Sequence, residues 1–271
     1  MGEWNAMTYE GKDTILRVVR REAERMFAMV EEPGAFNAPT ACTGWSARDV
    51  VGHLIDTTEG YFDSFDAARS NQQRELSNLP AMLETANKGA IRFRDLTQPE
   101  LMDRARIDFD KMMGILEPLT KEEWEGFIVE HYYMGPVPAF FYAAGQLMDY
   151  SVHGWDILEG RSGGAHHVLD ADSADLLVPF MLLLWKYTIR PDADLTPYEI
   201  GLRISGNSGG DYKVSMSEAG MEYDIGDIDG LTRIEYDSGS LVLAAYNRTH
   251  AGAVRGDPAI ANRFLNSFFA I

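Results

Sequence analysis

The spacing of apolar residues changes along this 271-residue chain, and that change most limits the folds available to it. Before Gly160, apolar residues recur at helical spacing, as Ile15, Val18 and Val19 do within one segment. After Tyr198 they alternate with polar residues in short segments bounded by Gly, Asn, Asp or Ser, a pattern typical of strands joined by tight turns. We therefore predict an α+β protein, with an all-helical part before Gly160 and a mixed part after it.

The N-terminal part is predicted to contain four long helices. Two of their starts carry capping signals: Ser46 and Asp49 fit a capping box, and Thr97 precedes a proline at an early helical position. The predicted long helices cover residues 12–31, 46–71, 97–117 and 139–159, and a shorter helix covers residues 81–96. Four long helices with modest connections predict a four-helix bundle, in which side chains from facing helices can converge on one site.

A glycine-rich segment, residues 160–164, separates the two parts of the chain. We place the domain boundary there, which gives a first domain over residues 1–162 and a second over 163–271. The second domain is predicted to hold an antiparallel sheet. Its predicted helices cover residues 172–187, 238–247 and 258–269, and its predicted strands cover residues 200–204, 212–216, 221–225 and 231–236.

The composition favours a folded cytoplasmic protein without nucleic-acid or membrane partners. Hydrophobic residues make up 45% of the chain, enough for a core, and the net charge of −18 repels phosphate backbones. Cys42 is the only cysteine, so no internal disulfide can form and a reducing compartment is expected. The first residues lack the features of a secretory signal, and the longest apolar run, 176–185, is too short to span a bilayer. A homodimer remains open.

Three residues are candidate metal ligands. Asp149 and His153 are four positions apart, so a helix places them one turn apart on the same face. Taken alone, this pair is better explained by a solvated carboxylate and a hydrogen-bonded core histidine. His53, far upstream in another helical segment, adds a third donor. Three ligands from two helices would leave one coordination position open, as in catalytic zinc sites.

Two segments resemble the mycothiol-dependent maleylpyruvate isomerase family. They are residues 40–54 (TACTGWSARDVVGHL) and residues 148–156 (MDYSVHGWD). The resemblance covers roughly residues 10–160 and implies a DinB-like four-helix bundle with a divalent metal held by two histidines and one glutamate. These ligands carry over to His53, Asp149 and His153. The carboxylate is therefore an aspartate in this chain, one methylene shorter than the family's usual glutamate.

The end of the chain is similar to a second family. Residues 253–258, followed by an apolar helix, resemble the end of sterol-carrier-protein-type domains, which follow the bundle in many relatives. The resemblance also places Arg248 where relatives carry an arginine that can meet substrate carboxylates. Arg248 is accordingly a candidate catalytic residue, and the alternative is an ordinary surface arginine.

The resemblance implies a metal-dependent thiol transferase or isomerase. Its cofactors would be a divalent metal, Zn or Ni, and a low-molecular-weight thiol such as mycothiol, and its substrate an electrophilic small molecule. Thiol addition to an alkene, bond rotation and elimination would give cis–trans isomerisation. Two alternatives stay open: a binding protein for an apolar small molecule or lipid with a vestigial metal site, and a metal-dependent hydrolase.

Cys42 lies in the loop before the second predicted helix. A position of this kind can lower the pKa of a thiol and make it a nucleophile. No histidine stands near Cys42 in the sequence, however, so we expect a half-buried structural thiol. Trp45, in the same loop, is expected to pack against the bundle.

Overall fold

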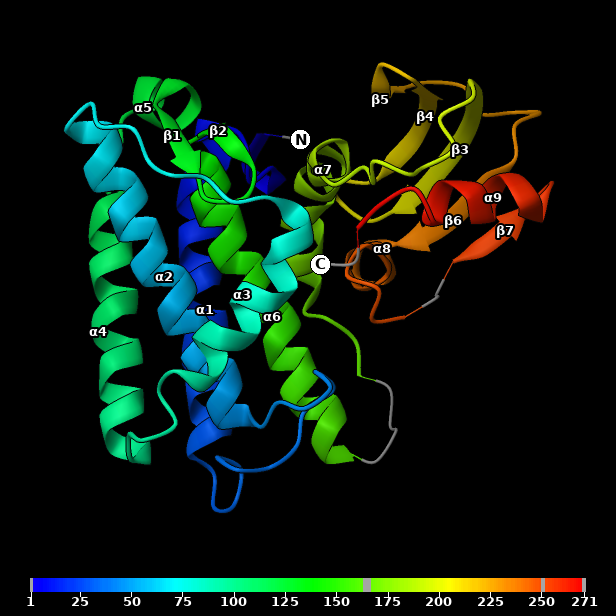
Figure 1. The fold of residues 1–271 in the computed structure, drawn as a ribbon. Coiled ribbons are helices and arrows are strands. Elements are labelled where there is room, and N and C mark those ends of the chain that lie inside the picture. Colours follow the sequence, from blue (N-terminus) through cyan, green and yellow to red (C-terminus); the bar gives the residue numbers. More distant parts are fainter. Residues whose placement is uncertain (1, 163–166, 250–251, 270–271) are drawn as a thin grey trace. The chain divides into compact units, whose positions relative to one another are not determined.

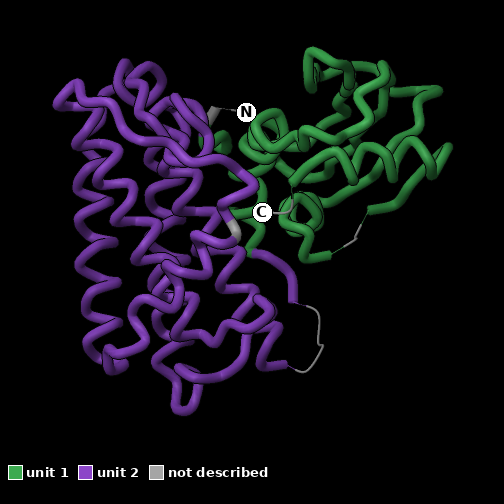
Figure 2. The backbone as a smooth tube through the Cα atoms, in the orientation of Figure 1, with its two compact units in different colours: residues 1–6, 170–271 green, residues 7–169 purple. Residues whose placement is uncertain are grey.

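The computed structural model describes residues 2–162, 167–249 and 252–269. The chain forms two compact units: residues 7–169 make one, and residues 1–6 together with 170–271 make the other (Figure 2). The sequence placed the boundary after Ser162 and assigned the N-terminal segment to the first domain. In the structure, Ser208 donates a hydrogen bond to the carbonyl of Trp4, which links that segment to the unit formed by the C-terminal residues.

The first unit contains the four long helices expected from the sequence (Figure 1). Helices α1 and α6 pack against each other, and α2 packs against α3, α4 and α6. The helices of this unit are α1 (Lys12–Glu31), α2 (Ala47–Arg69), α3 (Leu79–Ile91), α4 (Gln98–Leu116), α5 (Lys121–Gly126) and α6 (Phe140–Ser162). Their inward faces are apolar, as predicted from the helical spacing: Ile15, Val19 and Met26 on α1 are all fully buried.

A short hairpin interrupts the helical unit, so the prediction that everything before Gly160 is helical is wrong. Strands β1 (Ile128–His131) and β2 (Gly135–Pro138) pair antiparallel and bury Val129 against Val137. Gly135 has a φ of 71°, which favours glycine at this turn. The prolines of β2 cannot donate the hydrogen bonds that a helix requires. The strands are only four residues long, and this brevity hid the alternation.

In its described residues, the second unit combines three α-helices with a five-stranded sheet of order β5-β4-β3-β6-β7. Its elements are α7 (Ala171–Tyr187), β3 (Tyr198–Ser205), β4 (Gly210–Ser217), β5 (Gly220–Ile225), β6 (Arg233–Asp237), α8 (Ser238–Ala245), β7 (Ala253–Arg255) and α9 (Pro258–Leu265). This arrangement confirms the α+β fold class. The sheet is antiparallel, as predicted, except that β6 pairs with β3 in parallel. Strand β7 was missed because its three residues are all exposed and show no alternation.

None of the helices in the described part of the chain combines the length and the apolar character needed to cross a bilayer.

Candidate functional site

The structure brings the three predicted metal ligands together inside the helical unit. His53 comes from α2, and Asp149 and His153 come from neighbouring turns of α6. One donor atom from each residue lies within 4.8 Å of the other two. The imidazole rings of His53 and His153 meet edge to face, with their centroids 5.1 Å apart. Asp149 and His153 are buried and His53 is partly exposed.

The buried environment of Asp149 fits the binding of a divalent cation. Its Oδ2 is buried and has no hydrogen-bond partner. Burial raises the pKa of Asp149 to about 6, although the neighbouring His153 works in the opposite direction. A buried, unpaired carboxylate oxygen costs on the order of 1–3 kcal/mol or more. A cation shared with the two imidazoles would remove that cost, since carboxylate oxygen and imidazole nitrogen are both good zinc ligands.

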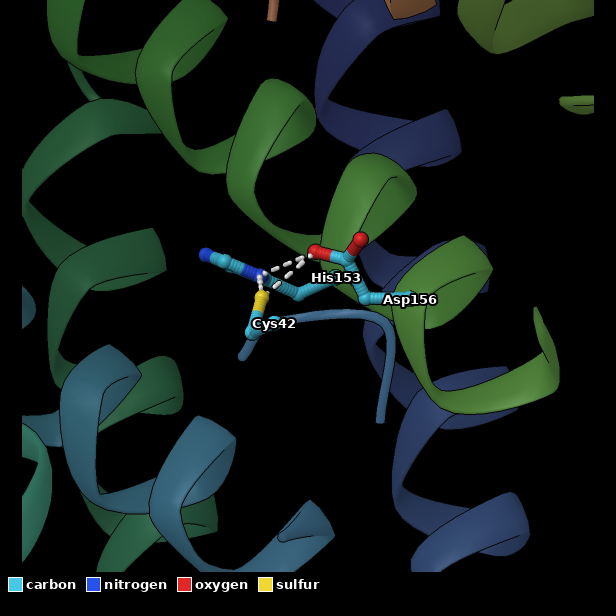
Figure 3. A group of neighbouring side chains, drawn as sticks. All are labelled: Cys42, His153 and Asp156. Atoms are coloured by element: carbon cyan, nitrogen blue, oxygen red, sulfur yellow. Dashed lines mark hydrogen bonds and ion pairs between the residues drawn. The ribbon is translucent and has the colours of Figure 1, made fainter. Parts of the chain in front are cut away.

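Asp156 controls the orientation of His153. Its Oδ2 lies 2.9 Å from the Nδ1 of His153, one turn further along α6, and the carboxylate is fully buried. Burial disfavours the protonated ring, but the hydrogen bond to Asp156 and the contact with Cys42 raise the pKa of His153 to about 10. At a pKa this high the free ring carries a proton on each nitrogen at neutral pH, so a metal at Nε2 would replace the Nε2 proton while the Nδ1 proton stays on the side of Asp156. Figure 3 shows this second nitrogen pointing away from Asp156 and Cys42. Metal-binding histidines commonly have such a carboxylate partner.

Cys42 lies in this cluster, which the sequence did not predict. Its Sγ is 3.0 Å from Oδ2 of Asp156 and 3.8 Å from Nδ1 of His153 (Figure 3). The contact was not predicted because Cys42 and His153 are separated by 111 positions in the sequence. One signal was present in the sequence: Asp156 follows His153 by three positions, so a helix places both side chains on the same face.

The loop that carries Cys42 is fixed against α6. The amide of Ala41 donates to the carbonyl of Asp156 at 2.8 Å, and the amide of Thr40 donates to the carbonyl of Trp45 at 3.1 Å. Gly160 permits the close approach: a Cβ on it would lie 2.3 Å from the Cα of Thr40. The thiol therefore has a defined position beside His153.

Trp45 forms an aromatic wall beside the two histidines. Its ring centroid lies 5.1 Å from that of His53 and 6.1 Å from that of His153. Its indole nitrogen donates to Oδ1 of Asn87 at 2.8 Å. The residue thus packs within the helical unit, as expected, and also borders the candidate metal site.

The start of α2 is fixed by the capping box predicted from the sequence. The backbone amide and the hydroxyl of Ser46 each lie 2.9 Å from Oδ2 of Asp49. Arg94 also donates two hydrogen bonds to the carboxylate of Asp49. Burial would raise the pKa of Asp49, but the hydrogen bonds from Arg94 and Ser46 lower it below its usual value. An ionised Asp49 therefore holds the N-terminal turn of the helix that carries His53.

Arg248, the candidate catalytic residue, belongs to the other compact unit. It follows α8, and its Nη1 donates to the carbonyl of Tyr246 at 3.1 Å. Its catalytic role remains a prediction.

Comparisons with known proteins agree with the resemblance read from the sequence. Two crystal structures of the mycothiol-dependent maleylpyruvate isomerase, one of them a variant with a histidine replaced by alanine, share the fold. Each matches with a TM-score of 0.56 at 12% identity, covering 90% of this chain and 91% of the other. The crystal structure of the colibactin self-resistance protein ClbS in complex with a dsDNA matches 57% of this chain and 97% of its own, with a TM-score of 0.49 at 14% identity.

No curated protein matches this chain. The family model of the mycothiol maleylpyruvate isomerase N-terminal domain matches residues 18–158, which is more than half of the sequence. The chain therefore belongs to the family of the mycothiol maleylpyruvate isomerase N-terminal domain.

Proposed function

We propose that this protein is a metal-dependent thiol transferase or isomerase that acts on an electrophilic small molecule. The observation that carries the proposal is the convergence of His53, Asp149 and His153, whose donor atoms lie within 4.8 Å of one another in a member of this family. When bound, a divalent cation such as Zn²⁺ or Ni²⁺ would lower the pKa of a thiol such as mycothiol, and the thiol would supply a nucleophile for an activated alkene.

The residues of the site have separate tasks in this proposal. Asp149 supplies a negative charge to the cation, which two neutral imidazoles cannot do. Asp156 holds Nδ1 of His153 and thereby leaves Nε2 for the metal. Trp45 lies beside both imidazoles and limits the access of water to that side of the site. Since the three ligands come from two packed helices, little conformational entropy is lost when they bind.

The C-terminal unit is proposed to be a sterol-carrier-like domain. Its support is the segment before α9, where Gly256 has a φ of 103° and Asp257 caps the helix by accepting a hydrogen bond from Ala259. Arg248 is the residue of this unit proposed to bind a substrate carboxylate. An Arg248→Lys variant tests this role: a raised KM for carboxylate substrates with an unchanged metal content would support it.

The proposal is tested by metal content and thiol-dependent activity. The protein is purified, stripped of metal with a chelator and reloaded with Zn²⁺ or Ni²⁺. Isomerisation of a maleylpyruvate-type substrate is then measured with mycothiol, with glutathione as the matched thiol control. We expect one tightly bound ion at this site and turnover that requires both metal and thiol. His53→Ala should abolish both metal binding and turnover.

Three outcomes would contradict the proposal. Turnover without a thiol would favour metal-dependent hydrolysis or another activity. A protein that takes up no metal, and whose circular dichroism shows an intact fold, would favour a binding protein with a vestigial site. Equal turnover by wild type and His53→Ala would separate the activity from this site.

A further inference from the structure

We propose that Cys42, His153 and Asp156 form a second divalent-cation site, on the Nδ1 side of His153. The imidazole of His153 would then bridge two ions, one bound at Nε2 with His53 and Asp149 and the other at Nδ1 with Cys42 and Asp156. The three residues offer three different donor types: a thiol sulfur, an imidazole nitrogen and a carboxylate oxygen. Each of these is an established zinc ligand.

The distances between the donor atoms fit one small ion. Sγ of Cys42 lies 3.0 Å from Oδ2 of Asp156 and 3.8 Å from Nδ1 of His153, and Nδ1 lies 2.9 Å from Oδ2. Ligands at the usual zinc distances in a tetrahedron are separated from one another by about 3.4–3.6 Å. Shifts of a few tenths of an ångström would therefore convert the hydrogen-bonded cluster into a metal site, with the fourth position left for water or a ligand.

Binding at this site exchanges protons for metal. In the hydrogen-bonded cluster, the S–H of Cys42 donates to Asp156, and Nδ1 of His153 shares a proton with the same carboxylate. An ion takes the place of both protons, which leave to solvent, and no oxidant or reductant is needed. Cys42 is partly exposed while its two partners are buried, so the thiol side of the cluster is the route by which an ion enters.

The charges balance when both sites are filled. Two divalent cations bring four positive charges. Asp149, Asp156, the thiolate of Cys42 and the bridging imidazolate of His153 bring four negative charges, and His53 is neutral. Buried charges are costly unless they are paired, and this arrangement leaves none uncompensated. The balance favours a second ion that is divalent and binds sulfur readily, such as Zn²⁺ or Cd²⁺.

The loop that carries Cys42 and helix α6 preorganise the donors of the second site. The loop is tied to α6 by the hydrogen bond from Ala41 to the carbonyl of Asp156, and Gly160 allows the loop to approach the helix closely. His153 and Asp156 are fixed on one face of a rigid helix. Ordering these donors therefore costs little entropy at the moment of binding.

The presence of one cysteine makes the test specific. Metal-free protein is titrated with Co²⁺ and, separately, with Cd²⁺, and thiolate-to-metal charge transfer is followed in the ultraviolet. Since Cys42 is the only cysteine, such a band can come from no other thiolate of the protein. Ions per chain are counted by elemental analysis. We expect two ions per chain and a charge-transfer band in the wild type.

Matched variants separate the two sites. Cys42→Ala and Cys42→Ser should each bind one ion and lose the band, with circular dichroism as the control for folding. The double variant His53→Ala/Asp149→Ala should lose one ion and keep the band. This result would support the second site independently of the proposed thiol chemistry. A wild type with one ion per chain, or without a band that depends on Cys42, would overturn the proposal.

Discussion

Two buried histidines in the helical unit have opposite electrostatic environments. His131 ends β1 of the hairpin and His153 lies on α6, and their exposures are nearly equal at 9% and 8%. Burial and the nearby Arg74 lower the pKa of His131 to about 4. Burial acts in the same direction on His153, but the contacts with Asp156 and Cys42 together outweigh it and raise the pKa of His153 to about 10.

The difference lies in the partner of Nδ1. In His131, Nδ1 accepts hydrogen bonds from the amides of Tyr133 and Met134, each at 3.3 Å, so the ring is neutral and fixes a turn. In His153, Nδ1 faces a carboxylate and Nε2 is left for a ligand. Equal burial therefore does not distinguish these two histidines, whereas the chemical nature of the Nδ1 partner does.

Replacing each histidine should give the largest contrast. His153→Ala removes both ring nitrogens, and each of the two proposed sites thereby loses one donor. We therefore expect no measurable binding of Zn²⁺ or Ni²⁺ by this variant. His131→Asn keeps an acceptor near the position of Nδ1 and lies outside the metal cluster, so its metal content should equal that of the wild type. Elemental analysis after dialysis gives the answer, and equal metal loss in the two variants would contradict the distinction.

Replacing Asp149 should have the next largest effect on metal binding. Asp149→Ala removes the negative ligand and should weaken metal binding by more than about 100-fold, while relieving a buried, unpaired oxygen and leaving the fold intact. Asp149→Glu restores the side chain that the family resemblance implies and should keep the metal or bind it more tightly. Competition with a chelator of known affinity measures both. A wild type that binds no metal while Asp149→Glu does would show a degenerate site.

The closeness of His53, Asp149 and His153 could be predicted because these residues lie within local patterns and within the two segments that carry the family resemblance. The spacing of Asp149 and His153 on one helix, and the capped helix that carries His53, can both be read from single segments. Cys42 and Asp156 could not be joined in the same way, because their contact depends on how a loop packs against α6 far along the chain. A close approach such as the one Gly160 allows leaves no periodic signal in the sequence.

The fold, like the site, was predicted where the sequence pattern is local and missed where long-range packing decides the structure. The long helices have a strong period, and their limits were found within a few residues; α1 covers residues 12–31 as expected. The hairpin around His131 was missed because its strands are short and β2 contains two prolines. The parallel pairing of β3 with β6 was also missed, because strand order is set by long-range packing rather than by the alternation of single strands.

The pH dependence of stability should follow His131. Its pKa is about 4 in the folded protein and about 6.5 in the unfolded chain, so between these values the unfolded chain binds more protons. Stability from this group is complete above pH 6.5 and is lost as the pH falls toward 4. At pH 5 the loss is about 2 kcal/mol, since each pKa unit corresponds to about 1.36 kcal/mol.

The control for this effect is His131→Asn, which cannot titrate in this range. Urea unfolding of metal-free wild type and variant is compared at pH 7 and pH 5. The wild type should lose about 2 kcal/mol more than the variant. Identical pH profiles would mean that His131 is not the neutral, buried group that its two amide partners indicate.

The smallest expected effect comes from Asp156→Asn, which tests what holds His153 in place. Asparagine has nearly the same shape as aspartate but no charge, so the ring keeps a partner while losing the anion that favours a proton on Nδ1. If the amide turns its nitrogen toward the ring, the proton moves to Nε2 and competes with the metal.

We expect metal binding at His53, Asp149 and His153 to weaken about 10-fold, at the low end of what loss of an outer hydrogen-bond partner costs. The measurement is made in a Cys42→Ala background, so that only this site is counted. Unchanged affinity would show that α6 alone orients the imidazole, and loss of all metal would show that Asp156 is itself a ligand.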